Sequence, residues 1–148
     1  MIIWREATAD DIAAIVALMS DDPLGAKREG ADLAPYLAGF AAMQAEGANF
    51  LFIGEREGAV IATYQLTFIT GLSHQAARRA QIESVRVAAS LRSSGIGALL
   101  LRDAESRARA AGCRVIQLTT TKSRARAQSF YLTHGYEPTH IGFKKSLG

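Results

Sequence analysis

The sequence from Val85 to Ala98 reads Val-Arg-Val-Ala-Ala-Ser-Leu-Arg-Ser-Ser-Gly-Ile-Gly-Ala. Its first residues favour a β-strand and its last residues begin a helix, so two glycines stand at a helix start. The unpaired N–H groups and positive dipole of a helix N-terminus bind phosphate, and Gly95 and Gly97 would let a ligand approach the backbone. Arg92 adds a fixed positive charge. The alternative is that both glycines only ease the packing of the helix against the strand.

Two nucleotide-binding signatures do not fit this segment. A dinucleotide fingerprint needs a third glycine, and a Walker loop needs Gly-Lys followed by Ser or Thr. The segment instead resembles the acetyl-CoA motif of the GCN5-related N-acetyltransferases (the GNAT family). In that motif a strand ends in Val, and four variable residues precede Arg or Gln-x-x-Gly-x-Gly or Ala. Val87, Arg92, Gly95 and Gly97 fill these positions.

A second segment, Ala127 to Tyr136, is similar to the family pattern Ala-x-x-Phe-Tyr-x-x-x-Gly-Phe/Tyr and follows an expected strand at Val115 to Leu118. Two motifs in the right order favour the resemblance over glycines that serve packing alone. One position departs from the family, because Arg124 stands where many members carry an Asn that contacts the pantetheine arm. That contact is in doubt here, and Arg124 could meet a phosphate instead.

The resemblance implies acetyl-CoA as co-substrate, with no metal. It also implies that the strand containing Val85 and Val87 splays from its neighbour, so that a backbone N–H near Val85 supports the oxyanion of the tetrahedral intermediate. Main-chain N–H groups from Ser93 to Ala98 would hold the pyrophosphate. The cofactor-binding residues predicted on this basis are Val85, Arg86, Val87, Arg92, Ser93, Ser94, Gly95, Ile96, Gly97, Ala98 and Arg124.

Two side chains are candidates for the proton transfers. Tyr131 matches the family position that protonates the departing CoA thiolate, and a phenol suits this role because its ordinary pKa is about 10; the alternative is core packing. Strand alternation would place Glu83 on the same face as Val85 and Val87. A carboxylate among apolar side chains can act as a general base. Glu83 could equally be exposed or pair with Arg86, with water as the base.

Hydrophobic periodicity predicts strands over 2–7, 49–55, 59–72, 81–88, 114–120 and 141–147, and helices from Thr8 and over 32–45, 95–111 and 124–134. Their order, β-α-α-β-β-β-α-β-α-β, is an α/β (α+β) pattern, a mixed sheet flanked by helices. The resemblance implies the GNAT fold, with a mixed, largely antiparallel sheet of six to seven strands and about four helices. Because no repeat or linker divides the chain, we expect a single GNAT domain over 1–148.

Composition excludes several classes of protein. Apolar residues make up 49% and charged residues 21% of the 148 residues, as in globular proteins. The apolar run Ala13–Met19 is too short to span a bilayer, and the single Cys113 suits a cytoplasmic location. The net charge of +3 suggests an anionic partner, but aromatic stacking platforms and DNA-binding motifs are missing, so nucleic acid ranks lowest. The three His and one Cys lack metal-ligand spacing.

The leading interpretation is therefore an N-acetyltransferase that acts on a primary amine of a small metabolite by direct transfer in a ternary complex. Acetylation of a protein N-terminus or lysine is a rival within the same class. A non-catalytic acetyl-CoA sensor is a rival from another class, because it would keep the phosphate cradle without the acid. No motif identifies the acceptor. The resemblance is also compatible with a homodimer, although no interface is marked in the sequence.

Overall fold

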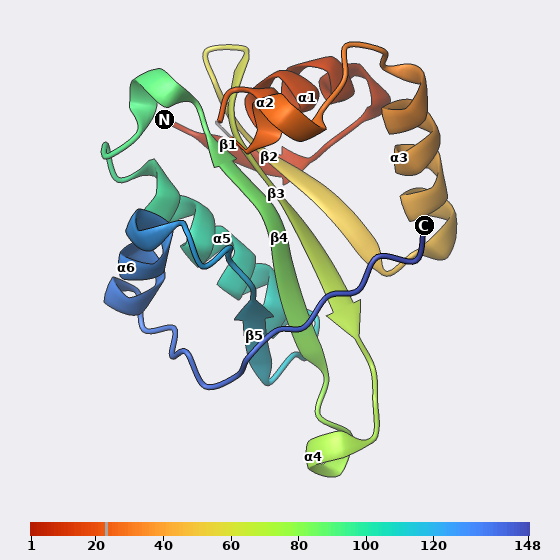
Figure 1. Ribbon diagram of the computed structural model, residues 1–148, viewed down its shortest axis with the longest axis vertical. Coiled ribbons are helices and arrows are strands. Elements are labelled where there is room, and N and C mark those ends of the chain that lie inside the picture. The colour runs from red at the N-terminus through yellow and green to blue at the C-terminus, as the bar shows by residue number, and fades with distance from the viewer. Residues whose placement is uncertain (23) are drawn as a thin grey trace.

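A five-stranded mixed sheet forms the centre of the computed structural model (Figure 1). The strands lie in chain order; the first four pair antiparallel, and the last pair is parallel. The structure describes residues 1–22 and 24–148. The elements are β1 (Ile3–Glu6), a 3₁₀ turn (Ala9–Asp11), α1 (Ile12–Ser20), α2 (Gly25–Arg28), α3 (Ala34–Glu46), β2 (Asn49–Arg56), β3 (Ala59–Ile69), α4 (Ser73–Ala76), β4 (Arg79–Val87), a second 3₁₀ turn (Ala89–Leu91), α5 (Ile96–Ala110), β5 (Val115–Leu118) and α6 (Ala125–Thr133).

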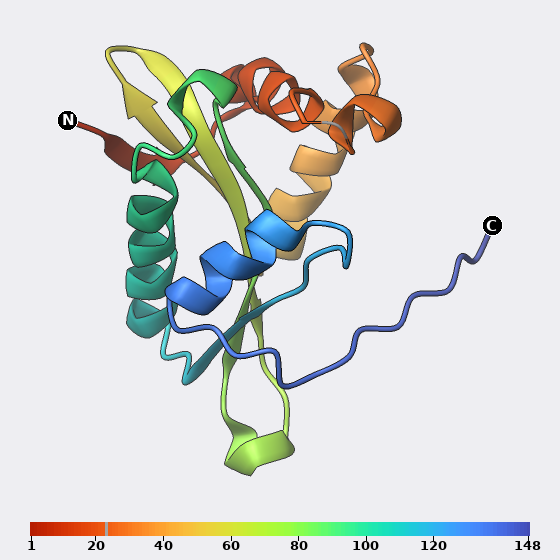
Figure 2. The same ribbon diagram turned by 60° about the vertical axis from the view of Figure 1, so that its left-hand side comes forward.

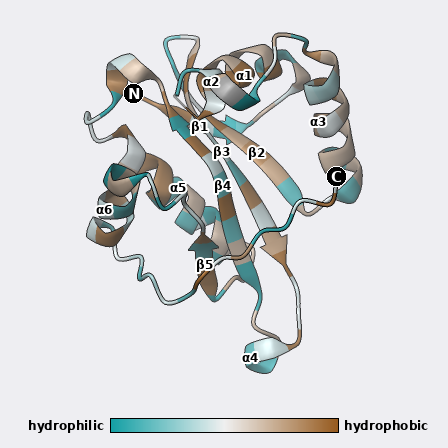
Figure 3. Ribbon diagram, in the orientation of Figure 1, coloured by the Kyte–Doolittle hydropathy of each residue, from teal (hydrophilic) through white to brown (hydrophobic). Residues whose placement is uncertain are grey.

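Helices cover both faces of the sheet, with α1 and α3 on one face and α5 and α6 on the other (Figures 1 and 2). Figure 3 shows hydrophobic residues recurring along the central strands, which serve both cores. The core under α1 and α3 consists of Ala7, Ile12, Ile15, Val16, Phe40 and Ile53. The larger core under α5 consists of Phe52, Ile61, Ala62, Tyr64, Leu66, Ala80, Ile82, Ile96, Leu100, Leu101, Ala104 and Ala108. Within the described residues, no helix has the length and apolar character needed to cross a membrane.

Local signals at the start of α1 work as expected. The Thr8 N–H donates to Asp11 Oδ2 at 2.8 Å, which closes the capping arrangement before the helix. Ile12, Ile15 and Val16 recur at helical spacing and are buried, so they form the apolar face of α1. Pro23, Gly25 and Gly30 favour a loop over residues 21–30, but this stretch contains the short helix α2. One loop residue in that stretch, Pro23, lies outside the described residues.

Turn chemistry explains the boundaries of the next elements. Helix α3 ends at Gly47, whose φ of 73° is the left-handed conformation typical of a C-terminal cap. The strands predicted over 49–55 and 59–72 form an antiparallel hairpin, and its turn residues Glu57 and Gly58 have φ values of 53° and 77°. Phe40 is the buried anchor of α3. Leu37 has the helical spacing of a residue on the same apolar face, but it is exposed.

The expected strand count is wrong at the C-terminus. The described residues form five strands instead of six to seven, and the segment predicted as a strand over 141–147 has no strand partner. It is extended and exposed, because no neighbouring strand offers it backbone hydrogen bonds. The mixed sheet and the four helices of nine or more residues agree with the predicted fold class.

Candidate active site

Strand β4 carries a β-bulge where it approaches the predicted site. Gln65 of β3 pairs with Glu83 and Thr63 pairs with Arg86, so two residues of β4 stand opposite one residue of β3. Ser84 adopts φ of 53°, a left-handed conformation that is uncommon outside glycine. A bulge of this kind inserts one residue and exchanges the faces of the side chains that follow it.

The bulge overturns the predicted placement of Glu83. Residues 63 and 65 share one face of β3, so their partners Glu83 and Arg86 share that face of β4. Val85 and Val87, which were expected to lie beside Glu83, pack instead against the core under α5. Glu83 is exposed and accepts a hydrogen bond from Gln81 Nε2 at 2.6 Å. Its carboxylate therefore lies on the α1 side of the sheet and outside an apolar environment.

Strands β4 and β5 separate midway along β4. Their pairing runs from Arg79 and Val115 to Ile82 and Leu118, where β5 ends. Strand β4 continues to Val87, so its backbone groups that face away from β3 have no strand partner over this stretch. We call this arrangement the β4–β5 splay. Within this stretch the Val85 carbonyl accepts a hydrogen bond from Arg86 Nη1 at 2.9 Å. The splay itself agrees with the separation of strands that the resemblance implied.

The loop before α5 presents unpaired N–H groups next to this splay. The hydrogen-bond ladder of α5 starts with the Leu99 N–H and the Gly95 carbonyl at 3.3 Å, so the N–H groups before Leu99 precede the ladder. Ser93 and Gly95 have φ values of 63° and 85°. A Cβ on Gly95 would meet no atom within 4 Å, so open space lies above this glycine. These are the features that phosphate groups need at a helix N-terminus.

Gly97 has a different role from Gly95. A Cβ on Gly97 would stand 3.0 Å from Cζ of Phe130 on α6. This glycine therefore permits the close contact between α5 and α6. The contact joins two helices, whereas the packing alternative had expected a helix against a strand.

Two arginines flank the α5 loop. Arg92 Nη2 donates to the Asp21 carbonyl at 3.2 Å and remains exposed. Arg126, on the first turn of α6, donates to the Ser93 hydroxyl. Sequence reasoning identified Arg92 but did not single out Arg126, because the contact with Ser93 forms between segments distant in sequence. The basic character of the stretch before α6 was the only signal for it.

A buried ion pair lies on the Glu83 face of β4. Arg86 Nε is 2.9 Å from Asp22 Oδ2, and the two side chains are only 8% and 6% exposed. Arg124 Nη1 stands 3.8 Å from the same oxygen, and the Gly25 N–H donates to Asp22 Oδ1 at 2.6 Å. We call Arg86, Asp22 and Arg124 the arginine–aspartate cluster. Arg86 comes from β4, Asp22 from the segment after α1 and Arg124 from the residue before α6, so the cluster links these three parts of the chain.

Electrostatics within the cluster keep Asp22 ionised. Burial acts to raise the pKa of Asp22, but the Gly25 hydrogen bond and the charges of Arg86 and Arg124 outweigh it, so its pKa lies below the ordinary value. Burial lowers the pKa of Arg86, and Asp22 counteracts part of this. With Asp22 ionised, the two guanidinium groups leave the cluster with an excess of positive charge. Asp22 carries no local sequence signal, and sequence reasoning missed it.

Tyr131 of α6 lies within the influence of this cluster. Burial raises the pKa of its phenol, while the charges of Arg124 and Arg86 act in the opposite direction. Its ring contacts Phe130 and Tyr136 at centroid distances of 5.3 and 5.8 Å. Its hydroxyl makes no hydrogen bond within the described part of the chain. The phenol is thus protonated at neutral pH and able to donate that proton.

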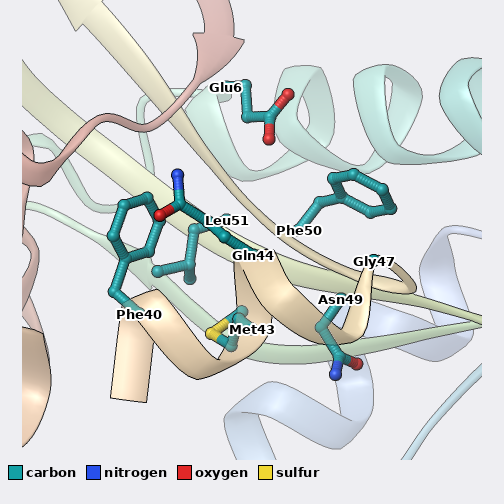
Figure 4. A pocket seen from close by; sticks show the side chains of 8 residues that line it. All are labelled: Glu6, Phe40, Met43, Gln44, Gly47, Asn49, Phe50 and Leu51. Carbon is teal, nitrogen blue, oxygen red and sulfur yellow. The ribbon is translucent and has the colours of Figure 1, made fainter. Parts of the chain in front are cut away.

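A separate cavity of about 240 Å³ lies between α3 and β2 (Figure 4). Phe40, Met43, Phe50 and Leu51 line it together with Glu6. None of the predicted site residues contributes to it. The cavity is therefore distinct from the candidate active site.

The single cysteine lies away from the candidate site. Cys113 precedes β5 at the paired end of the two strands, away from the splay. Burial raises the pKa of its thiol, which disfavours the nucleophilic thiolate. Residues 1–22 and 24–148 contain no group of three or more His, Cys, Asp or Glu side chains arranged to bind a metal ion. The chemistry at hand is that of backbone N–H groups, arginines, a carboxylate and a phenol.

Comparison with known proteins agrees with this geometry. The sequence profile of the Acetyltransferase (GNAT) family matches residues 12–136, so the chain belongs to this family and is an acyltransferase.

Individual relatives are similar to this chain over nearly its whole length. The chain is 31% identical over 143 residues to the aminoalkylphosphonate N-acetyltransferase of Salmonella typhimurium, covering 97% of this chain and 90% of that protein. A crystal structure from Bacillus halodurans, described as a transcriptional regulator, has a TM-score of 0.94 at 35% identity and covers 99% of this chain and 100% of its own. The structure of a putative acetyltransferase from Agrobacterium tumefaciens gives a TM-score of 0.87 at 26% identity, over 97% of this chain and 99% of its own.

Proposed function

We propose that this chain transfers the acetyl group of acetyl-CoA to the primary amine of a small molecule that also carries a phosphonate or similar anionic group. The observation that carries the acetyl-transfer part is the β4–β5 splay directly before the unpaired N–H groups of the α5 loop. The family as a whole uses acetyl-CoA, and the residues present fit it. Open space above Gly95 and left-handed Ser93 support a backbone cradle for its pyrophosphate.

The predicted residues divide into three groups with respect to acetyl-CoA. The loop from Ser93 to Ala98 would bind the pyrophosphate through backbone N–H groups, and Arg92 and Arg126 would add charge at its rim. The backbone around Val85 and Val87 would meet the pantetheine arm and polarise the thioester carbonyl. Arg86 and Arg124, which were expected among the cofactor-binding residues, would act on the acceptor side instead, because they meet at Asp22 on the Glu83 face of β4.

Transfer requires two proton movements around one substitution. The amine nitrogen attacks the thioester carbonyl carbon; a C–N bond forms and the C–S bond breaks as the thiolate leaves. Tyr131 would give its phenolic proton to that thiolate, and the raised pKa keeps the proton available at neutral pH. Glu83, exposed on the acceptor side, would take the amine proton directly or through water.

The arginine–aspartate cluster supports an acceptor that carries an anionic group. Two guanidinium groups converge on one carboxylate beside Tyr131, and Arg124 is more accessible than Arg86. Guanidinium groups bind phosphonate and phosphate oxygens through paired N–H donors. The similarity to an aminoalkylphosphonate N-acetyltransferase supports the same class for this chain. A small acceptor would therefore present its amine to the thioester and its anionic group to Arg124.

A thiol-release assay tests both parts of this proposal. Three acceptors of equal chain length are compared: an aminoalkylphosphonate, the corresponding aminoalkylcarboxylate and the uncharged alkylamine. We expect kcat/KM to be about tenfold or more higher for the phosphonate than for the alkylamine. Arg124→Gln should raise KM for the phosphonate about tenfold, whereas Arg102→Gln, on the exposed face of α5, should leave it unchanged.

The outcomes separate the two claims. Lack of CoA release with any small amine or peptide would overturn acetyl transfer by this chain. Equal rates with the phosphonate and the alkylamine would retain acetyl transfer and overturn only the anionic acceptor. Turnover confined to peptides would assign the chain to protein acetylation.

A further inference from the structure

A chain of side-chain hydrogen bonds crosses from β5 to β4 beside the β4–β5 splay. Gln117 Nε2 of β5 donates to Gln81 Oε1 of β4 at 2.9 Å, and Gln81 Nε2 donates to Glu83 Oε1 at 2.6 Å. Gln81 and Gln117 are partners in the strand register, and Glu83 lies two residues after Gln81 on the same face of β4. We call Gln117 and Gln81 the glutamine relay, because together they connect β5 to the Glu83 carboxylate.

The relay lies where the pairing of the two strands ends. The last pair between β4 and β5 is Ile82 with Leu118, so Glu83 is the first residue of β4 beyond the paired stretch. The relay crosses one pair earlier, at Gln81 and Gln117, and reaches forward along β4 to Glu83. It therefore ties the paired part of the sheet to a side chain at the edge of the splay.

The relay has a direction, because the two ends of a glutamine amide differ. An ionised carboxylate only accepts hydrogen bonds, so Gln81 must present its NH₂ end to Glu83. The carbonyl end of Gln81 then faces β5, where the N–H of Gln117 satisfies it. Gln117 thus fixes the orientation in which Gln81 can hold the carboxylate.

The Glu83 side chain depends on this support. It is exposed, and the bond from Gln81 is the one hydrogen bond that its carboxylate makes with residues 1–22 and 24–148. Arg86, which shares its face of β4, pairs with Asp22 instead. A glutamate held by no partner samples many rotamers, whereas a general base acts only within hydrogen-bond reach of the proton that it removes.

We propose that Gln81, oriented by Gln117, is a positioning residue that holds the Glu83 carboxylate where it takes the proton of the acceptor amine. The amine proton goes to Glu83 and from there to water, and the relay itself exchanges no proton. This inference rests on the proposed function, in which Glu83 is the base. The alternative is that the two glutamines only link β4 to β5, in which case their effect would not depend on Glu83.

A double-mutant cycle separates these roles. The rate constant kcat is measured for wild type, Gln81→Met, Glu83→Gln and the double variant, with the acceptor that has the highest kcat/KM of the three compared above. Methionine keeps the length of glutamine and removes both amide groups. We expect Gln81→Met to lower kcat about tenfold with KM for acetyl-CoA unchanged. In the Glu83→Gln background, Gln81→Met should have no further effect.

Gln117→Glu tests the direction of the relay. A carboxylate at this position only accepts, so it draws the NH₂ end of Gln81 towards β5 and away from Glu83. We expect kcat to fall about fivefold while the circular dichroism spectrum stays that of wild type. Thr67→Val is the matched control. Thr67 lies opposite Gln81 on β3, but its hydroxyl donates to Asn49 Oδ1 at 2.8 Å, away from Glu83, so kcat should be unchanged.

Any of three results would overturn the positioning role. The first is a wild-type kcat in folded Gln81→Met or in Glu83→Gln, the second is full additivity of these two substitutions, and the third is a wild-type kcat in Gln117→Glu. If Gln81→Met does not fold, the same cycle with Gln117→Glu decides. A wild-type chain that acetylates none of the acceptors overturns the proposed function as well, whereas an active wild type with one of the three results overturns the relay alone.

Discussion

At the scale of single residues, Ser84 determines which side chains share a face of β4 with Glu83. Its left-handed backbone adds one residue to β4, and Arg86 thereby shares a face with Glu83. Without that residue, strict alternation would place Val85 there. The bulge thus brings a carboxylate and a guanidinium to one side of the strand while the valines stay in the core.

Tyr131→Phe tests the assigned proton donor. The substitution keeps the ring and removes the proton, so we expect kcat to fall about 100-fold with little change in KM for acetyl-CoA. Tyr136→Phe is the matched control, because this neighbouring phenol donates towards Glu105 at 3.4 Å and should retain its kcat. Because burial raises the pKa of Tyr131, the wild-type rate should not decline until the pH exceeds about 10. Equal rates for Tyr131→Phe and wild type would remove Tyr131 from the mechanism.

Asp11 gives the fold a measurable dependence on acid. Hydrogen bonds from Arg5, above all, lower the pKa of Asp11 from 3.8 to about 2, with help from Thr8 and against the effect of burial. The folded pKa lies below the unfolded one, so this stabilisation is complete above about pH 4 and is lost as the pH falls towards 2. It amounts to about 2 kcal/mol.

Urea unfolding of Asp11→Asn at several pH values measures this contribution. The difference in unfolding free energy between wild type and variant should shrink by about 2 kcal/mol between pH 6 and pH 2. Asp10→Asn, at an exposed neighbour, should show no such change. A pH-independent difference for Asp11→Asn would contradict the ion-pair explanation.

At the scale of secondary-structure elements, the contact between α5 and α6 depends on Gly97. Phe130 has limited freedom to yield, since its ring lies 5.3 Å from the Tyr131 ring and 4.4 Å from the His134 ring. Gly97→Ala should therefore lower the unfolding free energy by about 1–2 kcal/mol. Gly39→Ala provides the comparison, because its Cβ would enter open space on α3.

For Gly39→Ala we expect a gain of about 0.5–1 kcal/mol from helix propensity alone. Chemical unfolding of the two variants under identical conditions gives the comparison. An equal gain for both would show that the α5–α6 contact adjusts freely and that Gly97 is not required for packing.

Elements with short-range signals could be predicted from the sequence. Thr8 and Asp11 mark the start of α1, Gly47 marks the end of α3, and a turn containing Gly58 marks the hairpin. Each signal acts within a few residues, so local chemistry suffices to place it. The two motifs of the candidate site were predictable for the same reason.

Features that depend on long-range contacts could not be predicted. Serine does not favour the left-handed conformation, so the sequence does not predict the bulge at Ser84. The bulge follows from the register of β4 against β3. Asp22 joins the site because the segment after α1 reaches β4, more than sixty residues away in sequence. A strand was predicted over 141–147, but a strand also needs a neighbour, and among the described residues no strand pairs with this segment.

At the scale of the whole molecule, the sheet is organised around one discontinuity. Antiparallel pairing holds β1 to β4 together, and the parallel strand β5 separates from β4 after only part of its length. The helix that follows β4 and the helix that follows β5 both begin near this splay, as the contact between Arg126 and Ser93 shows.

The most direct test of acetyl transfer is a matrix of initial rates. CoA thiol release is measured while acetyl-CoA and an aminoalkylphosphonate are varied together, and mass spectrometry verifies that the amine becomes acetylated. We predict intersecting double-reciprocal lines, because both substrates must be bound before the C–N bond forms. Parallel lines, which indicate a covalent acetyl-enzyme, or no acetylated amine at all would contradict direct transfer at the β4–β5 splay.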